Sequence, residues 1–208
     1  MTARCDSGSR RLKCRVGEGK LNGRRISKHH SEGLRTIRRA MAAELETALR
    51  ALAAMNPQAA REAGNLITGI AAIKSKIEDR ARALGYAEKC RRSIAVCAGE
   101  CCRWHFPKHL SRVDFFAAVF TLPAADRAAL TSQVRRTGDR VYQCPLLLSD
   151  GCIFSFENRP TVCTAAYPCL AGSGYWEYKE RFRNELTRLR KALRKLVDKY
   201  GVDPRDEH

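Results

Sequence analysis

Cysteine is the residue type whose number and spacing in this sequence could support chemistry. The chain has 208 residues and ten cysteines, and seven of the cysteines fall in two short stretches. The first, CAGECC, covers residues 97–102, and the second, CPLLLSDGCIFSFENRPTVCTAAYPC, covers residues 144–169. Clustered cysteines form disulfides, act as catalytic nucleophiles or bind metal ions, so the rest of the sequence has to discriminate among these explanations.

The N-terminal sequence argues against disulfides. It begins MTARCDSGSRRLKCRVGEGK, which is basic and polar and has no apolar segment of a secretory signal behind it. We also find no apolar run of about 18 residues, so we expect no transmembrane helix and no membrane partner. The expected location is therefore the reducing cytoplasm, where cysteine patterns are more often metal-binding or catalytic. A chain of this length also buries enough core to fold without disulfides.

Metal binding explains the clustering best. Thiolates are soft ligands that suit zinc, iron and iron–sulfur clusters, whereas a catalytic thiol usually stands alone beside a base. Cys97 and Cys101 can chelate one ion from a single turn, whereas the side chains of the neighbours Cys101 and Cys102 diverge. Cys90, further upstream, would bring the number of cysteine ligands to eight, which is enough for two four-cysteine sites or for one multinuclear cluster. The predicted metal ligands are Cys97, Cys101, Cys102, Cys144, Cys152, Cys163, Cys169 and Cys90.

The order of these cysteines resembles a known family. C-x3-CC, a spacer of 41 residues, CP-x-L, Gly-Cys, an aromatic-E-N-R-P segment and a closing Pro-Cys are similar to the zinc- or iron-chelating domain family of CxxCxxCC-type proteins. The motif is also similar to that of flagellin lysine N-methylase. The resemblance covers about residues 90–170 and rests on Cys97, Cys101, Cys102, Cys144, Pro145, Leu147, Gly151, Cys152, Ile153, Phe156, Glu157, Asn158, Arg159, Pro160, Cys163, Pro168 and Cys169.

The resemblance implies metal binding by cysteine, and for the methylase-like motif an iron–sulfur cluster. In such a site Pro160 would fix the turn before Cys163, and Arg159 could donate hydrogen bonds to a thiolate or a carbonyl around the metal ligands. A solvated Arg159 is the alternative. The chain departs from the family in CAGECC, where C-x2-C-x2-CC is usual, and in Thr164, where an Arg is usual. It also has no glycine-rich loop for a methyl-donor nucleotide.

The segments around the cysteines predict a mainly α protein. We divide the chain into a basic disordered arm (residues 1–30), a helical hairpin (31–86), a cysteine-rich metal-binding module of irregular loops (87–173) and a C-terminal amphipathic helix (174–208). Ser31 is a candidate N-cap, Asn56-Pro57 separates the two hairpin helices, and Gly85 is a candidate stop. The apolar stripes of the hairpin are Leu34, Ile37, Met41, Leu45, Ala48, Leu49, Leu52 and Met55, then Leu66, Ile67, Ile70, Ile73, Ile77, Ala81 and Leu84.

Two further helices are expected. ADRAALTSQVRR follows Pro123 and predicts a short helix, and an apolar seam predicts a long one from residue 174 onward. The long helix either docks on the hairpin or forms a dimerising coiled coil. We expect five aromatic residues to wall the metal site from water and to pack on the helices as part of the core: Trp104, Phe106, Phe115, Phe116 and Phe120. The seam is Tyr175, Tyr178, Phe182, Leu186, Leu189, Leu193, Leu196 and Tyr200.

Charge suggests a further partner. The formal net charge is +17, and residues 1–40 hold twelve Lys and Arg against three acids. Such an arm can bind nucleic acid, although the simpler interpretation is a disordered tail without a partner. We therefore predict a cytoplasmic protein that binds zinc or iron through cysteine thiolates, with the metal at least structural. An iron–sulfur enzyme or accessory protein for redox or methyl-group transfer is the first alternative, and nucleic-acid binding through the arm is the second.

Overall fold

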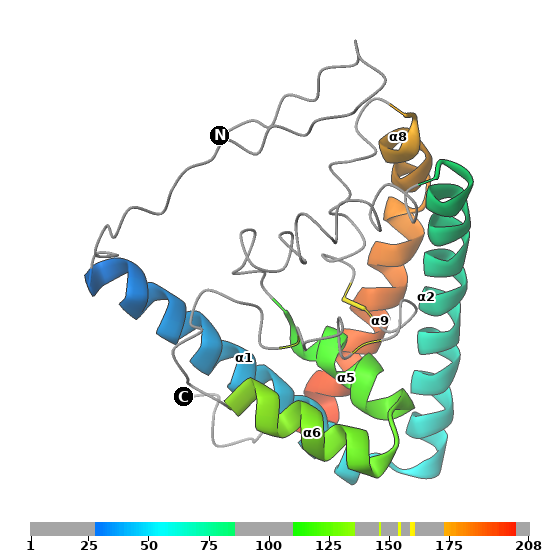
Figure 1. Cartoon of the computed structure of the whole chain (residues 1–208). Coiled ribbons are helices and arrows are strands. Elements are labelled where there is room, and N and C mark those ends of the chain that lie inside the picture. The colour runs from blue at the N-terminus through cyan, green and yellow to red at the C-terminus, as the bar shows by residue number, and fades with distance from the viewer. Residues whose placement is uncertain are drawn as a thin grey trace.

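Helices make up nearly all of the structure that can be described. The computed structural model describes residues 28–85, 110–135, 146, 154, 159–160 and 173–202, without the side chains of residues 28–35 and 38. Within these ranges there is no strand, and the prediction of a mainly α protein is confirmed. The helices are α1 (Lys28–Ala54), α2 (Pro57–Ala83), α5 (Arg112–Thr121), α6 (Ala124–Arg135), α8 (Tyr175–Glu180) and α9 (Arg183–Gly201) (Figure 1). None of these helices is long and apolar enough to cross a membrane.

The break between α1 and α2 lies where the sequence predicts it. The Oδ1 of Asn56 accepts a hydrogen bond from the backbone amide of Ala59 at 2.9 Å, and Pro57 occupies the first turn of α2. Proline is tolerated there because the first amides of a helix have no partner within the helix. Gly85 follows α2 with φ = 73°, a left-handed conformation that glycine adopts without steric cost. The start of α1 differs from the prediction, because helix begins at Lys28 and includes the last residues of the expected arm.

α1 and α2 do not form a closely paired hairpin. They diverge from the turn at Asn56, and α9 packs against both of them (Figure 1). The stripes on the two helices predicted that each would bury one face, but a stripe does not show which element covers it. α5 and α9 cover the apolar face of α1, and α9 and α8 pack on α2. The hairpin is therefore an open frame that the later helices fill.

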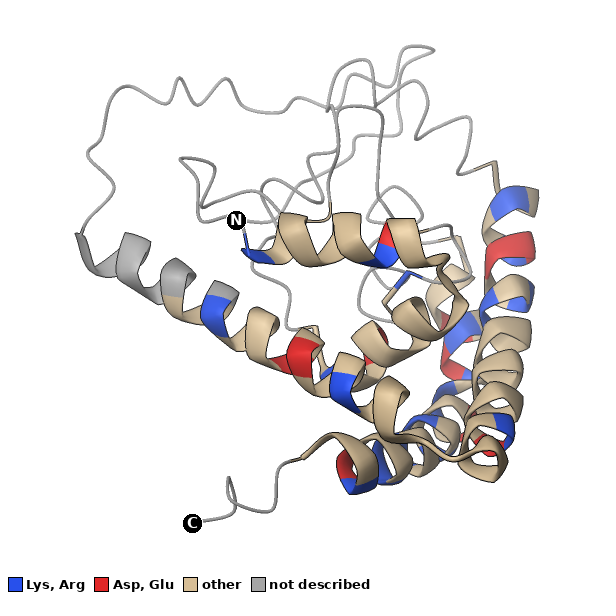
Figure 2. Ribbon diagram, turned by 90° about the horizontal axis from the view of Figure 1, so that it is seen from below, with Lys and Arg blue, Asp and Glu red and all other residues tan. Residues whose placement is uncertain are grey.

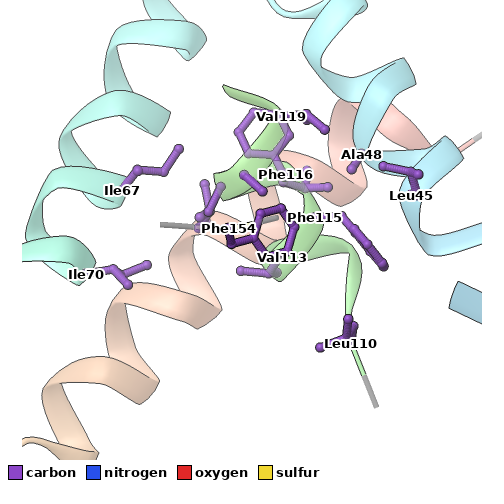
Figure 3. Packing of buried hydrophobic residues seen from close by; sticks show 14 of the residues in the cluster. Leu45, Ala48, Ile67, Ile70, Leu110, Val113, Phe115, Phe116, Val119 and Phe154 are labelled. Carbon is purple, nitrogen blue, oxygen red and sulfur yellow. The ribbon is translucent and has the colours of Figure 1, made fainter. Parts of the chain in front are cut away.

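The centre of the core is α5, a helix that lies within the predicted cysteine-rich module of irregular loops. Its residues from Val113 to Val119 are all buried, and Phe115 and Phe116 are fully enclosed. In Figure 3 these rings lie between Ile67 of α2 and Leu45 of α1. A helix that is apolar on all sides has no periodic pattern, because every face is covered. The expectation that Phe115 and Phe116 pack in the core is confirmed, whereas Trp104 and Phe106 lie outside the described residues.

The long C-terminal helix is present in two pieces. α8 ends at Glu180, α9 begins at Arg183, and the ring of Phe182 packs edge-on against Tyr178 with centroids 5.4 Å apart. α9 packs against α1, α2 and α5, and half of the predicted seam is buried, namely Tyr175, Leu186, Leu189 and Leu193, while the other half is partly buried. Docking on the N-terminal helices is thus what the structure shows. The buried residues of α9 are Leu186, Leu189, Leu193, Val197 and Gly201, so Val197 is buried where the prediction named Leu196.

Gly201 gives a test of the contact between α1 and α9. A Cβ at this position would clash with the carbonyl oxygen of Thr47 and would lie 3.0 Å from the Cβ of Ala51. We expect Gly201→Ala to destabilise the fold by about 1–3 kcal/mol, because backbone atoms cannot move aside as a flexible side chain can. The measurement is urea unfolding followed by far-ultraviolet circular dichroism.

Gly64→Ala is the matched control for this substitution. A Cβ at Gly64 would be 3.5 Å from Phe120, an ordinary contact. Alanine favours helix over glycine by about 1 kcal/mol, so this variant should unfold at the same or a higher urea concentration. Equal loss of stability in both variants would contradict the close packing at Gly201.

Candidate functional site

The structure shows the frame around the predicted metal ligands rather than the ligands themselves. All ten cysteines, and the basic residues 1–27, lie outside the described residues. Among the residues that are described, no three His, Cys, Asp or Glu side chains are grouped closely enough to hold a metal. We call residues 86–109 the first cysteine segment and residues 136–172 the second. Described residues flank both segments, and four more lie within the second one, at positions 146, 154, 159 and 160.

The first cysteine segment begins where the second one ends. Gly85 closes α2 immediately before the first segment, and Gly174 precedes α8 immediately after the second. α2 and α8 pack together, and the guanidinium carbon of Arg80 lies 5.9 Å from the ring centroid of Tyr178. In Figure 1 these two helix ends lie side by side at the same end of the molecule. The fold therefore brings together two positions that are almost ninety residues apart in the sequence.

The second cysteine segment enters the hydrophobic core at separate points. Leu146 and Phe154 are each 1% exposed and belong to the main core cluster. Phe154 lies next to Val113 and Phe116 of α5 (Figure 3). Pro160 is buried as well. Leu146, Phe154 and Pro160 lie eight and six residues apart in the sequence, so the segment is attached to the helices at three positions.

A buried lysine of α2 holds the segment at a further point. The Nζ of Lys74 donates a hydrogen bond to the backbone carbonyl oxygen of Arg159 at 2.7 Å, and Lys74 is only 4% exposed. Glu78, one turn later, is 3% exposed and accepts a hydrogen bond from Arg82 at 3.2 Å. Burial of an ammonium group is costly unless it is hydrogen-bonded, so this contact fixes the position of the Arg159 carbonyl relative to α2.

Lys74 is a residue that the sequence analysis missed. It lies four residues after Ile70, within the apolar stripe of α2, where a lysine interrupts an otherwise buried face. That interruption was a usable signal, because charged residues on a buried helix face need partners. The prediction for Arg159 concerned its side chain, and its contact with a metal ligand remains a prediction. What the structure describes is the role of the Arg159 backbone.

An ion pair secures the helix that follows the first cysteine segment. Asp114, in the first turn of α5, is 6% exposed and receives two hydrogen bonds from Arg190 of α9, at 2.6 and 3.1 Å. The amide and hydroxyl of Ser111 donate to the same carboxylate at 3.1 and 2.7 Å. Burial alone would raise the pKa of Asp114, but the hydrogen bonds and charge of Arg190 and the bonds from Ser111 outweigh it, so the pKa is lowered.

A second ion-pair group joins the same helix start to α1. Arg112 donates to both carboxylate oxygens of Glu44, at 3.0 and 3.1 Å, and to Asp198 of α9 at 3.1 Å. The hydrogen bond with Glu44 is the main reason that the pKa of Arg112 is raised. Bidentate pairs of this kind are geometrically specific. The residues directly after the first cysteine segment are thus fixed to both α1 and α9.

Comparisons of the chain with protein-family models, with curated proteins and with solved structures find no match.

The Asp114–Arg190 pair predicts a pH dependence of stability. The pKa of the Asp114 carboxyl is lower in the folded state than its usual value. The pair therefore stabilises the fold fully above the unfolded-state pKa of Asp, about 3.9, and this stabilisation is lost as the pH falls through the folded-state pKa. We expect Asp114→Asn to lower the free energy of unfolding at neutral pH by about 1.5–3 kcal/mol. Between about pH 6 and pH 3 the variant should also lose less stability than the wild type.

Urea unfolding at a series of pH values measures both effects. Glu180→Gln is the control, because its partner Arg183 is 71% exposed and pairs at a surface contribute about 0–1 kcal/mol. If Asp114→Asn had the same pH profile as the wild type, the pair would not determine the acid sensitivity of the α5–α9 contact.

Proposed function

We propose that this chain is a metal-binding protein that chelates zinc or iron through cysteine thiolates from both cysteine segments. The helices act as the frame that holds the segments in place. Eight cysteines with short spacings supply more soft ligands than one tetrahedral site needs. The resemblance to the zinc- or iron-chelating CxxCxxCC-type family supports the same proposal.

The proposal rests on the positions at which the second segment is attached to the core. Leu146 is two residues after Cys144, Phe154 is two residues after Cys152, and Pro160 is three residues before Cys163. A chain spans at most about 3.6 Å per residue, so each of these cysteines is tied within about 11 Å of a buried residue. Residues held this way need less loop-closure entropy to meet around one ion.

The attachment points also connect the two segments. The first segment starts at the α2–α8 contact, where the second segment ends, and it returns to the core at Leu110, beside α5. Phe154 of the second segment packs on the same helix α5. Both segments are thus anchored to the same helices, which supports a site that takes ligands from both.

An iron–sulfur centre is the second candidate, because the number of cysteines exceeds four. Thiolates hold such clusters, and the methylase-like motif is consistent with one. The two candidates differ in a direct observable. Broad absorption near 400 nm with iron and acid-labile sulfide indicates a cluster, whereas colourless protein with about one or two zinc ions per chain indicates zinc sites.

Cysteine substitutions test the proposal itself. Cys144→Ser and Cys163→Ser should each lower the metal content by about one ion per chain, because serine does not supply a soft thiolate ligand. Cys5→Ser, in the basic arm, should leave the metal content unchanged. The measurement is elemental analysis of protein purified anaerobically without added metal, with a visible absorption spectrum. Equal metal content in the three variants, or no metal in the wild type, would overturn the proposal.

Lys74→Met tests whether the frame determines the site. Methionine keeps the bulk of lysine but cannot donate a hydrogen bond to the Arg159 carbonyl, so the segment before Cys163 loses one attachment. Changes in the groups that orient metal ligands typically weaken metal affinity about 10–100-fold, and we expect a loss in this range. Competition with a chromophoric chelator measures the affinity.

Lys76→Met is the matched control, since Lys76 is exposed on the same helix two residues further on. It should retain wild-type affinity. Helix content and the unfolding midpoint of the metal-free proteins show whether Lys74→Met still folds. Unchanged metal affinity in a folded Lys74→Met protein would show that the Lys74–Arg159 contact does not position the ligands.

A further inference from the structure

The outer face of α9 carries a concentration of positive charge. Six Lys and Arg side chains of this 19-residue helix are exposed, against one exposed acid, Glu185. The described helices as a whole carry more Lys and Arg than Asp and Glu (Figure 2). The exposed basic residues of α9 are Arg183, Arg188, Lys191, Arg194, Lys195 and Lys199.

Four of these residues form a straight row. Arg188, Lys191, Lys195 and Lys199 follow one another at spacings of three, four and four residues, which places them on one face of the helix. With a rise of 1.5 Å per residue, the row is about 16 Å long. We call these four residues the α9 basic row. They lie on the side of α9 opposite its buried residues, such as Leu189 and Leu193.

The charge of the row is not neutralised within the described part of the chain. Asp198 pairs with Arg112 and lies 3.5 Å from Arg194, and Glu180 pairs with Arg183. Among the described residues, no carboxylate forms an ion pair with a member of the row. Four positive charges on one face of a helix repel one another, and a bound polyanion would relieve that repulsion.

We propose that the α9 basic row binds the phosphodiester backbone of nucleic acid. Phosphates supply negative charge at a regular linear spacing, which matches a row of cations on a straight helix. The row has no apolar side chains with which to enter a lipid bilayer, because the apolar face of α9 is buried against α1, α2 and α5. A helix that lies on a membrane inserts that face, so the packing of α9 favours nucleic acid over an anionic membrane.

An aromatic side chain lies near one end of α9. Trp176 of α8 is 38% exposed, and no other large hydrophobic side chain among the described residues is exposed. The Nζ of Lys179 is 5.3 Å from its ring centroid. α8 directly precedes α9 along the chain and lies at its N-terminal end (Figure 1). Exposed aromatic rings stack on unpaired bases, so Trp176 is a candidate second contact for a single strand.

Salt-dependent binding of the full-length protein tests the proposal. The probe is a fluorescently labelled single DNA strand of mixed sequence, and the same sequence as a duplex is measured in parallel. The test variant is Lys191→Gln/Lys195→Gln. Its charge-matched control is Arg61→Gln/Lys76→Gln, which removes two exposed cations from α2. The logarithm of the affinity falls linearly with the logarithm of the salt concentration. Each lost phosphate contact should make this slope less steep, by about 0.7 for the single strand or about 0.9 for the duplex.

We expect the row variant to lose about 1.4–1.8 of that slope and to bind more weakly at every salt concentration, while the control keeps the wild-type slope. The proposal is overturned by equal effects of the two variants, because that shows a general effect of net charge. Wild-type binding in the row variant, as expected if residues 1–40 bind alone, also overturns it. So does tighter binding of the wild type to phosphatidylserine vesicles than to either DNA probe.

Discussion

The structure depends on the burial of α9 between α1 and α2. The two N-terminal helices diverge from their turn, so neither can cover the apolar face of the other along its length. α9 supplies that cover for both helices through its leucine seam. The close approach of Gly201 to Thr47 shows how little space this contact leaves. Without α9 the frame would expose two apolar faces, which water disfavours in proportion to their area.

The docking of α9 also determines where α8 lies and which face of α9 is exposed. Because α8 directly precedes α9, docking of α9 brings α8 against the last turns of α2, where the first cysteine segment begins. Docking of α9 also buries its apolar face and leaves its basic face exposed. The proposed metal site and the proposed nucleic-acid surface therefore depend on one packing event, although they involve different residues and are tested separately.

Ion pairs at buried and partly buried positions give this packing its specificity. Asp114–Arg190 and Glu44–Arg112–Asp198 join α5 to α9 and α1, and all lie near the start of α5. A buried ion pair contributes little net stability once its desolvation is counted, so apolar contacts supply most of the free energy. An apolar helix such as α5 could slide or rotate in an apolar pocket with small cost. Directional pairs at one end select a single register, which in turn sets where the first cysteine segment meets the core.

Periodic segments were the predictable part of this fold. α1, α2 and the seam of α9 each bury one face and leave another in water, so their patterns could be read, and Asn56-Pro57 and Gly85 marked real boundaries. α5 could not be predicted in this way because every face of it is buried, and its sequence reads as a continuous apolar run. The pairing of α2 with α8 and the contact of Lys74 with Arg159 join residues far apart in sequence, and no local pattern encodes them.

The cysteine spacing predicted a ligand set, and the attachments of the second segment to the core are what the structure adds. The helical frame has its own large core, so its folding need not depend on a metal. Within the cysteine segments, the described positions Leu146, Phe154 and Pro160 are buried against the frame. A metal bound by the cysteines would add cross-links between these positions, and its binding free energy would stabilise the segments rather than the frame. On this argument, loss of metal should leave α1, α2 and α9 packed while the attachments at Phe154 and Arg159 weaken. The Lys74 contact would then be the point at which the two parts of the protein are coupled.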